Sequence, residues 1–407
     1  MMHRARAPQR RWLYYGSMAV VVLVALAVAG EIVLRVAPGL SPEARARSRL
    51  HRLQPTRTAV SKRIKIQEVA APATYAADPY LGAVLAPNEH DTVTTPEYRY
   101  ARDIDHAGFP NRDPWPRRVD AVVLGSSLVM GPGVGIDKQF STLLERRFPG
   151  HAFLNLGVPG GGSEMEYRAA TRYAEPYRPA LVIVAIWLAS DIDNSRQFAH
   201  WLAEKPTKGF TEYRFQYGST HPDIASNSRL RAFLQHSSLF RAIDLTTKAL
   251  LVRAPMRERV LVPGGDTLFL SVRLQHALAR GLARSDTPQM REVFFGPLQR
   301  LERRVESRGG HFLVVLLPSK EELFGAQAFP PVLTAIRETR RELRDRKIPF
   351  LDLYPVLDRP DAGAFFPTDI HYTARGNAII ANAIAGWITE HHVFGASSGS
   401  TTSAPVG

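Results

Sequence analysis

The sequence predicts an α/β fold, a three-layer α/β/α sandwich built on a doubly wound parallel sheet of about five strands. Two observations predict it. From residue 119 onward, short apolar runs recur that are continuous rather than alternating, as is typical of strands buried on both faces. Amphipathic stretches of helical length separate these runs, which is the pattern of parallel strands joined by crossover helices.

The expected elements follow in order along the chain. We expect strands at 120–124, 152–156, 181–188, 311–316 and 349–353, and helices at 139–148, 163–177, about 329–346 and 373–390. A flavodoxin-like sheet of this kind binds its ligands outside the carboxyl ends of the strands.

A long region, about 195–305, separates the third expected strand from the fourth. An ordinary connection is much shorter, so this region must carry structure of its own. Apolar residues in 229–252 have helical spacing, which indicates a helical insertion. Two interpretations stay open: the insertion caps the site, or it takes no part in substrate choice. Residues 72–118, rich in Pro and Tyr, are expected to form an irregular or β-rich segment packed against the core.

The net charge of +14 comes mostly from the N-terminal arm. Residues 1–67 contain 13 Lys or Arg and 2 acidic residues, whereas the remaining 340 residues hold 39 basic and 36 acidic ones. Basic residues that flank an apolar segment are attracted to anionic lipid headgroups. No nucleic-acid-binding signature accompanies them, so we expect no nucleic-acid partner. The absence of cysteine excludes disulfides and thiolate metal sites.

Residues 13–30 form a stretch of 18 residues without a charge, nearly enough to span a bilayer as a helix. We predict a transmembrane anchor helix at 13–36 rather than a cleaved signal peptide, although Ala27-Val28-Ala29 resembles a cleavage site. Arginines flank both ends, so the positive-inside rule does not decide the orientation. Because a short basic tail precedes the apolar segment and the main domain follows it, we expect a single-pass protein of the cell inner membrane with its main domain in the periplasm. The expected parts are a basic tail at 1–12, the anchor, a basic linker or stalk at 37–75, the main domain at 76–394 and a disordered tail at 395–407.

A serine turn follows the first expected strand, in the segment Gly125-Ser126-Ser127 that leads to Gly131. A serine between a strand's carboxyl end and a helix lies at the reactive edge of the sheet. Its backbone N–H can then help to bind an oxyanion. The alternative is that both serines cap the next helix.

Asp369 and His371 stand two positions apart before the last expected helix. A histidine can take a proton from a serine hydroxyl and return it to the leaving group, and a nearby carboxylate fixes its tautomer. Together with the serine turn, this pair predicts Ser127 as nucleophile, His371 as base and Asp369 as the orienting acid. Asp191 and Asp193 lack the spacing of a Ca²⁺ loop, so we interpret them as turn and N-cap residues. We expect no metal and no cofactor.

These residues resemble the SGNH (GDSL-like) hydrolase superfamily, in particular its membrane-anchored bacterial members, over roughly residues 76–390. The segment 122–127 is similar to the first block of the family, with Ser126 in place of the usual aspartate. The segment 155–160 resembles the second block, whose glycine N–H joins the oxyanion hole, and Gly160 matches that glycine better than Gly157. Asp369-Ile370-His371 is similar to the last block, with the short spacing found in polysaccharide O-acetyltransferases.

The third block departs from the family pattern, because Ser190 stands where the family has an asparagine oxyanion donor. Either the Ser190 hydroxyl or the Asn194 amide then supplies that donor. The resemblance implies a serine-dependent ester hydrolase (acyl or acetyl esterase) acting on an envelope glycan or lipid, with an acylated small molecule or glycan as substrate. A polysaccharide O-acetyltransferase with the same triad, or a catalytically weakened envelope-assembly protein, is the alternative. Nothing in the sequence indicates an oligomeric state.

Overall fold

The computed structural model describes residues 75–95, 97–204, 257–261, 267–271, 287–326, 330–358 and 362–395, with single positions and short runs between 22 and 37 and between 210 and 282. The chain divides into two compact units, residues 1–64 with 219–256, and residues 65–218 with 257–407. The second unit contains the features described below.

Several expectations fall outside the described residues. They are the tail at 1–12, most of the anchor at 13–36, nearly all of the stalk at 37–75, the helices within 229–252 and all of 395–407 but Gly395. Among the residues that the structure describes, no helix is long and apolar enough to cross a membrane.

Five parallel strands form the central sheet: β5 (Ala121–Gly125), β6 (Phe153–Gly157), β7 (Leu181–Ile186), β10 (His311–Leu316) and β11 (Phe350–Asp352). Their order across the sheet is β11-β10-β7-β5-β6, which is the flavodoxin-like doubly wound order. The prediction of a parallel five-stranded sheet is confirmed, and each strand lies within two residues of its expected bounds. Every residue of β5, β6 and β7 is buried, because helices cover both faces.

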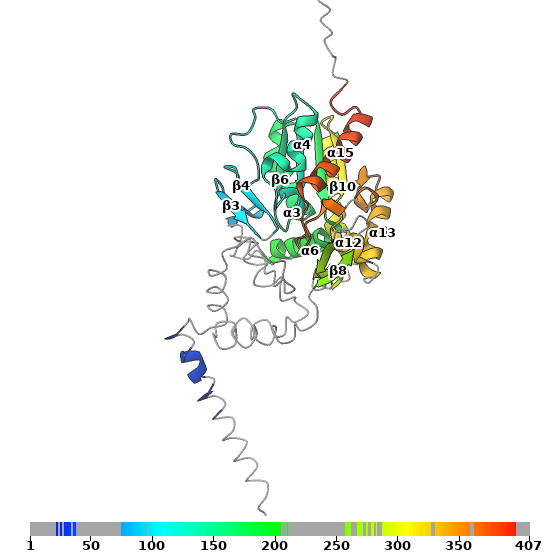
Figure 1. Ribbon diagram of the computed structural model, residues 1–407. Coiled ribbons are helices and arrows are strands. Elements are labelled where there is room, and N and C mark those ends of the chain that lie inside the picture. Colours follow the sequence, from blue (N-terminus) through cyan, green and yellow to red (C-terminus); the bar gives the residue numbers. More distant parts are fainter. Residues whose placement is uncertain are drawn as a thin grey trace, which may run out of the picture. The chain divides into compact units, whose positions relative to one another are not determined.

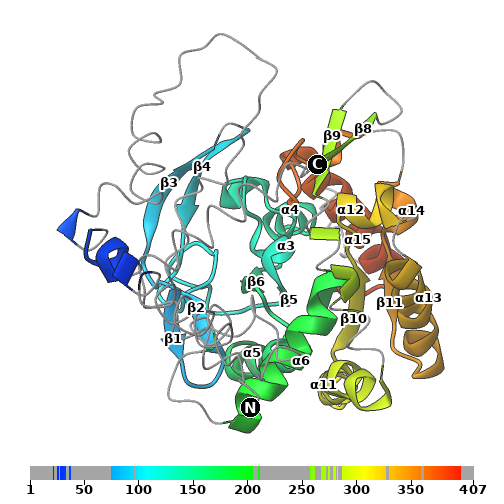
Figure 2. The same cartoon turned by 90° about the horizontal axis from the view of Figure 1, so that it is seen from below.

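The helices form the two outer layers (Figures 1 and 2). In Figure 2, α4 (Phe140–Arg147) and α15 (Ala374–Glu390) pack together on one face of the strands. On the other face, α5 (Ser163–Ala169), α6 (Leu188–Glu204) and α11 (Pro288–Glu306) contact one another, and α13 (Pro330–Asp345) contacts α6. The helix expected at 163–177 is continuous but changes type, with a π-helical turn at Ala170–Ala174 and a 3₁₀ turn at Glu175–Tyr177. Short helical turns among the described residues include α3 (Ser127–Met130), Ile136–Lys138, α12 (Lys320–Phe324), α14 (Tyr354–Leu357) and Ala362–Ala364.

The helices expected within 229–252 lie outside the described residues, and the described part of the region at about 195–305 contains strands that the sequence did not lead us to expect. Its two ends belong to the layer helices α6 and α11, and between them β8 (Arg257–Leu261) and β9 (Thr267–Ser271) form an antiparallel hairpin. In β9, Leu268 and Leu270 are buried whereas Phe269 and Ser271 are partly exposed. This alternation has the period of a strand and not of a helix.

Two further hairpins precede the sheet and confirm the β-rich segment expected before it. They pair β1 (Tyr75–Asp78) with β2 (Gly82–Leu85), and β3 (His90–Thr94) with β4 (Arg99–Asp103). The turn between β3 and β4 contains Glu97 and Tyr98. This turn lies against the loop that carries Asp369 and His371, as the contacts below show.

Candidate active site

Ser127 begins helix α3, two residues after the end of β5. The turn depends on Gly125, whose φ is +153°. A Cβ atom on Gly125 would lie 2.4 Å from the carbonyl oxygen of Ala185 and 2.4 Å from Cγ2 of Val129, so only glycine allows β7 and α3 to approach this closely. As the first helical residue, Ser127 has a backbone N–H with no acceptor inside its helix.

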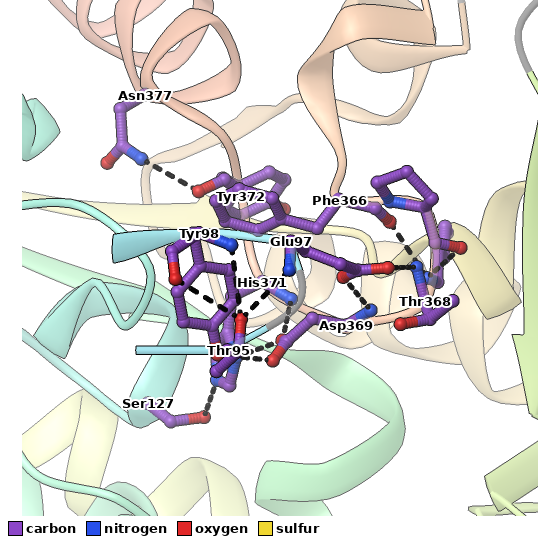
Figure 3. Close-up of polar contacts among 12 residues, drawn as sticks. Thr95, Glu97, Tyr98, Ser127, Phe366, Thr368, Asp369, His371, Tyr372 and Asn377 are labelled. Carbon is purple, nitrogen blue, oxygen red and sulfur yellow. Dashed lines mark hydrogen bonds and ion pairs between the residues drawn. The ribbon is translucent and has the colours of Figure 1, made fainter. Parts of the chain in front are cut away.

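The hydroxyl of Ser127 faces the imidazole of His371 at the carboxyl edge of the sheet (Figure 3). The distance from Ser127 Oγ to His371 Nε2 is 3.1 Å, and that from His371 Nδ1 to Asp369 Oδ1 is 2.6 Å. With Nδ1 donating to the carboxylate, Nε2 carries the lone pair that can accept the serine proton. The structure thus brings together the three residues that the sequence interpretation grouped.

Asp369 is held in its ionised form. Burial of its side chain alone would raise the pKa of Asp369, but the charge of His371 and hydrogen bonds from His371 and Tyr98 hold that pKa well below its usual range. The donors are Nδ1 and the backbone N–H of His371, which both reach Oδ1, and the hydroxyl of Tyr98, which reaches Oδ2. A carboxylate with three donors stays charged and can stabilise an imidazolium.

Two residues of the β3–β4 turn, which were not expected from the sequence, hold the Asp369 loop (Figure 3). Tyr98 donates its hydroxyl to Oδ2 of Asp369 at 2.7 Å. Glu97 accepts the backbone N–H groups of Thr368 and Asp369, at 2.7 and 3.0 Å. No spacing in the sequence links residues 97 and 98 to residue 369. Only the abundance of Pro and Tyr in 72–118 marked this segment.

The same loop is fixed from a second side by Lys320, which also escaped the sequence analysis. Its side chain is fully buried, and its ammonium donates to the carbonyl oxygens of Phe366 and Pro367 at 2.9 and 3.0 Å. The N–H of Phe269, in β9, donates to the carbonyl of Pro367 at 2.8 Å. The described part of the 195–305 region therefore reaches the loop of the candidate site.

The expected oxyanion donors lie at two places: Ser190 and Asn194 are in helix α6, and Gly160 is in the turn after β6. Asn194, on α6, donates its amide N–H groups to the carbonyl of Gly161 at 3.0 Å, to Ser190 Oγ at 3.1 Å and to Asp191 Oδ1 at 3.3 Å. Ser190 Oγ acts as acceptor in this bond, which leaves its own proton for another acceptor. Gly160 has a left-handed backbone with φ of +73°, a conformation that favours glycine in this turn.

Asp191 differs from its expected role as a turn or N-cap residue. It lies inside the first turn of α6 and is fully buried. It accepts the N–H of Trp187 at 2.7 Å and the hydroxyl of Ser126 at 3.3 Å. Burial raises the pKa of Asp191 to about 8 although these hydrogen bonds oppose the rise. Burial, together with the charge of Asp191, also raises the pKa of Glu166.

Asp193 also lies inside α6, where it pairs with Arg196 at 2.7 Å. Within the described residues, no group of three or more His, Asp or Glu side chains is arranged to hold a metal ion.

Part of the chain is similar to a known protein family. Residues 285–404 match the family model described as the SGNH hydrolase-like domain of acetyltransferase AlgX. Over this segment, the chain is similar to an SGNH hydrolase-like domain. The matched residues include Asp369 and His371, whereas Ser127 lies before them in the sequence. No curated protein matches the chain.

Solved structures similar to the chain include several esterases and lipolytic proteins. A lipolytic protein of the G-D-S-L family from Desulfitobacterium hafniense DCB-2 is 11% identical, with 66% of this chain and 98% of that chain covered and a TM-score of 0.35. A lipase/acylhydrolase from Enterococcus faecalis is 10% identical, with coverages of 67% and 97% and a TM-score of 0.35. The acetyl xylan esterase AlAXEase is 9% identical, with coverages of 66% and 99% and a TM-score of 0.34.

Proposed function

We propose that the chain is a serine-dependent ester hydrolase that releases an acyl or acetyl group through an acyl-Ser127 intermediate. The observation that carries the proposal is the continuous line of hydrogen bonds from Ser127 through His371 to Asp369, with distances of 3.1 and 2.6 Å. A nucleophile within reach of a base that a carboxylate orients is the arrangement that acyl transfer requires.

The reaction follows from the tautomer of His371. Nε2 takes the proton of Ser127 as Oγ bonds to the substrate carbonyl carbon, and the imidazolium is stabilised by Asp369. The ester C–O bond then breaks, and Nε2 returns the proton to the leaving alkoxide. In the second half, Nε2 takes a proton from water, the water oxygen attacks the acyl carbon, and Ser127 Oγ leaves with the proton.

The negative charge on the carbonyl oxygen needs hydrogen-bond donors. In our proposal the backbone N–H of Ser127 supplies one donor, and Gly160 supplies a second by its resemblance to the glycine of the second block. The third is the Ser190 hydroxyl, because the Asn194 amide donates to Gly161, Ser190 and Asp191. Asn194 then orients Ser190. One oxyanion donor is typically worth about 10²–10³ in turnover.

Acyl transfer is the second candidate, and the match of residues 285–404 to a domain of acetyltransferase AlgX favours it. The acyl-Ser127 intermediate is the same, and a sugar hydroxyl takes the place of water in the second half. Both candidates suit an envelope glycan or lipid as substrate. They also suit our proposal that residues 13–36 anchor the chain in the inner membrane with the main domain in the periplasm.

The test uses the purified full chain in detergent. We expect hydrolysis of p-nitrophenyl acetate and covalent labelling by a fluorophosphonate at Ser127, and both are lost in Ser127→Ala. Unchanged hydrolysis in Ser127→Ala contradicts the proposal. Absence of both labelling and turnover in the wild type indicates a catalytically weakened envelope-assembly protein. With an oligosaccharide and an acetyl donor present, an added acetyl mass on the sugar indicates transfer, and free acetate alone indicates hydrolysis.

A further inference from the structure

Tyr98 connects the β3–β4 hairpin to the acid of the proposed triad, across 271 positions of sequence. The two oxygens of Asp369 have different partners: Oδ1 accepts from His371 and Oδ2 accepts from Tyr98, at 2.6 and 2.7 Å. A carboxylate held at both oxygens by partners of fixed position cannot rotate about its terminal torsion without losing one of them.

The Tyr98 side chain is itself held in place. Its ring packs against that of Phe366, with 4.6 Å between the ring centroids. Its backbone N–H donates to Thr95 Oγ1 at 3.1 Å, and its carbonyl accepts the N–H of Thr95 at 2.9 Å. Burial and the charge of Asp369 raise the pKa of the Tyr98 hydroxyl, so the phenol remains protonated and acts as a donor.

Glu97 adds a second attachment between the same two segments. Its carboxylate accepts one backbone N–H with each oxygen, from Thr368 and Asp369. The β3–β4 turn thus holds the Asp369 loop by its backbone and by its functional carboxylate. Packing of the turn alone would not require a hydrogen bond to Oδ2 of Asp369.

We propose that Tyr98 is a positioning residue for the reaction, which acts through Asp369 to keep Oδ1 directed at Nδ1 of His371. The inference rests on the proposed function, because it concerns the same triad. It assigns the β3–β4 turn, which lies outside the segments that resemble the family blocks, to the catalytic assembly.

The first test is Tyr98→Phe, which removes one hydroxyl and keeps the ring. We expect kcat for p-nitrophenyl acetate to fall roughly tenfold to hundredfold, as for loss of a hydrogen bond to a charged group, with KM within about twofold. Tyr100→Phe is the matched control: it removes a hydroxyl two positions along the chain, on a ring 5.9 Å from that of Tyr98. Its kcat should stay near that of the wild type.

The second test separates positioning from a structural role. If Tyr98 acts through Asp369, Tyr98→Phe changes kcat little in an Asp369→Asn background, and the double variant matches Asp369→Asn alone. Multiplicative effects of the two substitutions, or wild-type kcat in Tyr98→Phe, overturn the inference. Glu97→Gln gives a second variant, because an amide can accept only one of the two N–H groups. We expect a reduced kcat there as well, and wild-type kcat in Glu97→Gln counts against the inference.

The outcomes distinguish this inference from the proposed function. Full activity of Ser127→Ala rejects the function whatever Tyr98 does. Loss of activity in Ser127→Ala with full activity in Tyr98→Phe keeps the function and rejects the role of Tyr98. Thermal denaturation of each variant tests whether folding is intact. A fall in kcat with an unchanged Tm cannot be due to loss of structure.

Discussion

The hydroxyl of Ser126 lies 3.3 Å from Oδ2 of the buried Asp191. The next hydroxyl in the chain, that of Ser127, lies instead 3.1 Å from His371 Nε2. Two adjacent serines therefore face opposite surroundings, one the interior beneath the turn and the other the reactive edge of the sheet.

This difference predicts opposite effects of two alanine substitutions. Ser127→Ala should lower kcat by at least about 10³-fold with little change in Tm, since it removes the nucleophile. Ser126→Ala should lower the free energy of unfolding by about 1 kcal/mol, through loss of one buried hydrogen bond, and keep most of the activity. Ester hydrolysis and thermal denaturation measure the two effects. Fluorophosphonate labelling that survives in Ser127→Ala and disappears in Ser126→Ala would reverse the assignment.

The oxyanion donor gives a second prediction. Ser190→Ala should lower kcat by about 10²-fold or more and leave Tm nearly unchanged, because Ser190 is partly exposed. Asn194→Ala should lower kcat too, since Ser190 loses the amide that orients its oxygen at 3.1 Å. Ser190→Asn introduces the asparagine that the resemblance to SGNH hydrolases implies at this position, and it should retain more activity than Ser190→Ala. Equal kcat in Ser190→Ala and the wild type shows that the hydroxyl is not a donor in the reaction.

The buried carboxyl of Asp191 predicts a pH dependence of stability. Its pKa is raised to about 8 in the folded chain, against about 3.9 in an unfolded one. Between these values the folded state binds more protons, so the free energy of unfolding falls as pH rises from about 4 to about 8. Asp191→Asn removes this contribution, and the fall in Tm between pH 5 and pH 8 should become shallower. Glu166 and Glu302, whose pKa values are also raised by burial, remain and act in the same direction. An identical slope in the variant and the wild type contradicts the prediction.

Two glycines of opposite surroundings give a paired prediction on stability. Gly125→Ala places a methyl group 2.4 Å from the Ala185 carbonyl oxygen. We therefore expect the free energy of unfolding to fall by more than about 2 kcal/mol and the activity to be lost. Gly386 is an exposed residue inside α15, and nothing lies within 4 Å of a Cβ built there. Gly386→Ala should stabilise the chain by about 0.5–1 kcal/mol with unchanged activity. Urea denaturation measures both, and a stable, active Gly125→Ala variant would show that the turn has room to adjust.

The sheet could be predicted from the sequence because β5, β6 and β7 are buried throughout, and β10 is buried after its first residue, so that these strands form mostly apolar runs. Ser127, Asp369 and His371 could be found because they lie in short motifs at the ends of secondary-structure elements. Ser127 begins the helix that follows β5, and Asp369 and His371 precede α15. The sequence does not decide between Ser190 and Asn194, because the hydrogen bond between them, which favours the serine, depends on side-chain geometry.

Tyr98, Glu97 and Lys320 could not be found in the same way. Their partners in 366–369 lie 46 to 272 positions away, and no periodicity or local motif encodes such pairs. The β8–β9 hairpin could not be predicted from the sequence for a different reason. Its strands are five residues each, too short for alternation to stand out in a region where helical spacing dominates.

The bond between Tyr98 and Asp369 also has a consequence for how the chain folds. It closes a loop of 271 residues, and the entropy of closing such a loop must be overcome before the contact forms. Strand pairs such as β5 with β6 join residues 32 positions apart and close at a smaller entropic cost. During refolding from urea, far-ultraviolet circular dichroism should therefore recover before esterase activity does. Catalytic competence would then be the last property that the folding chain acquires.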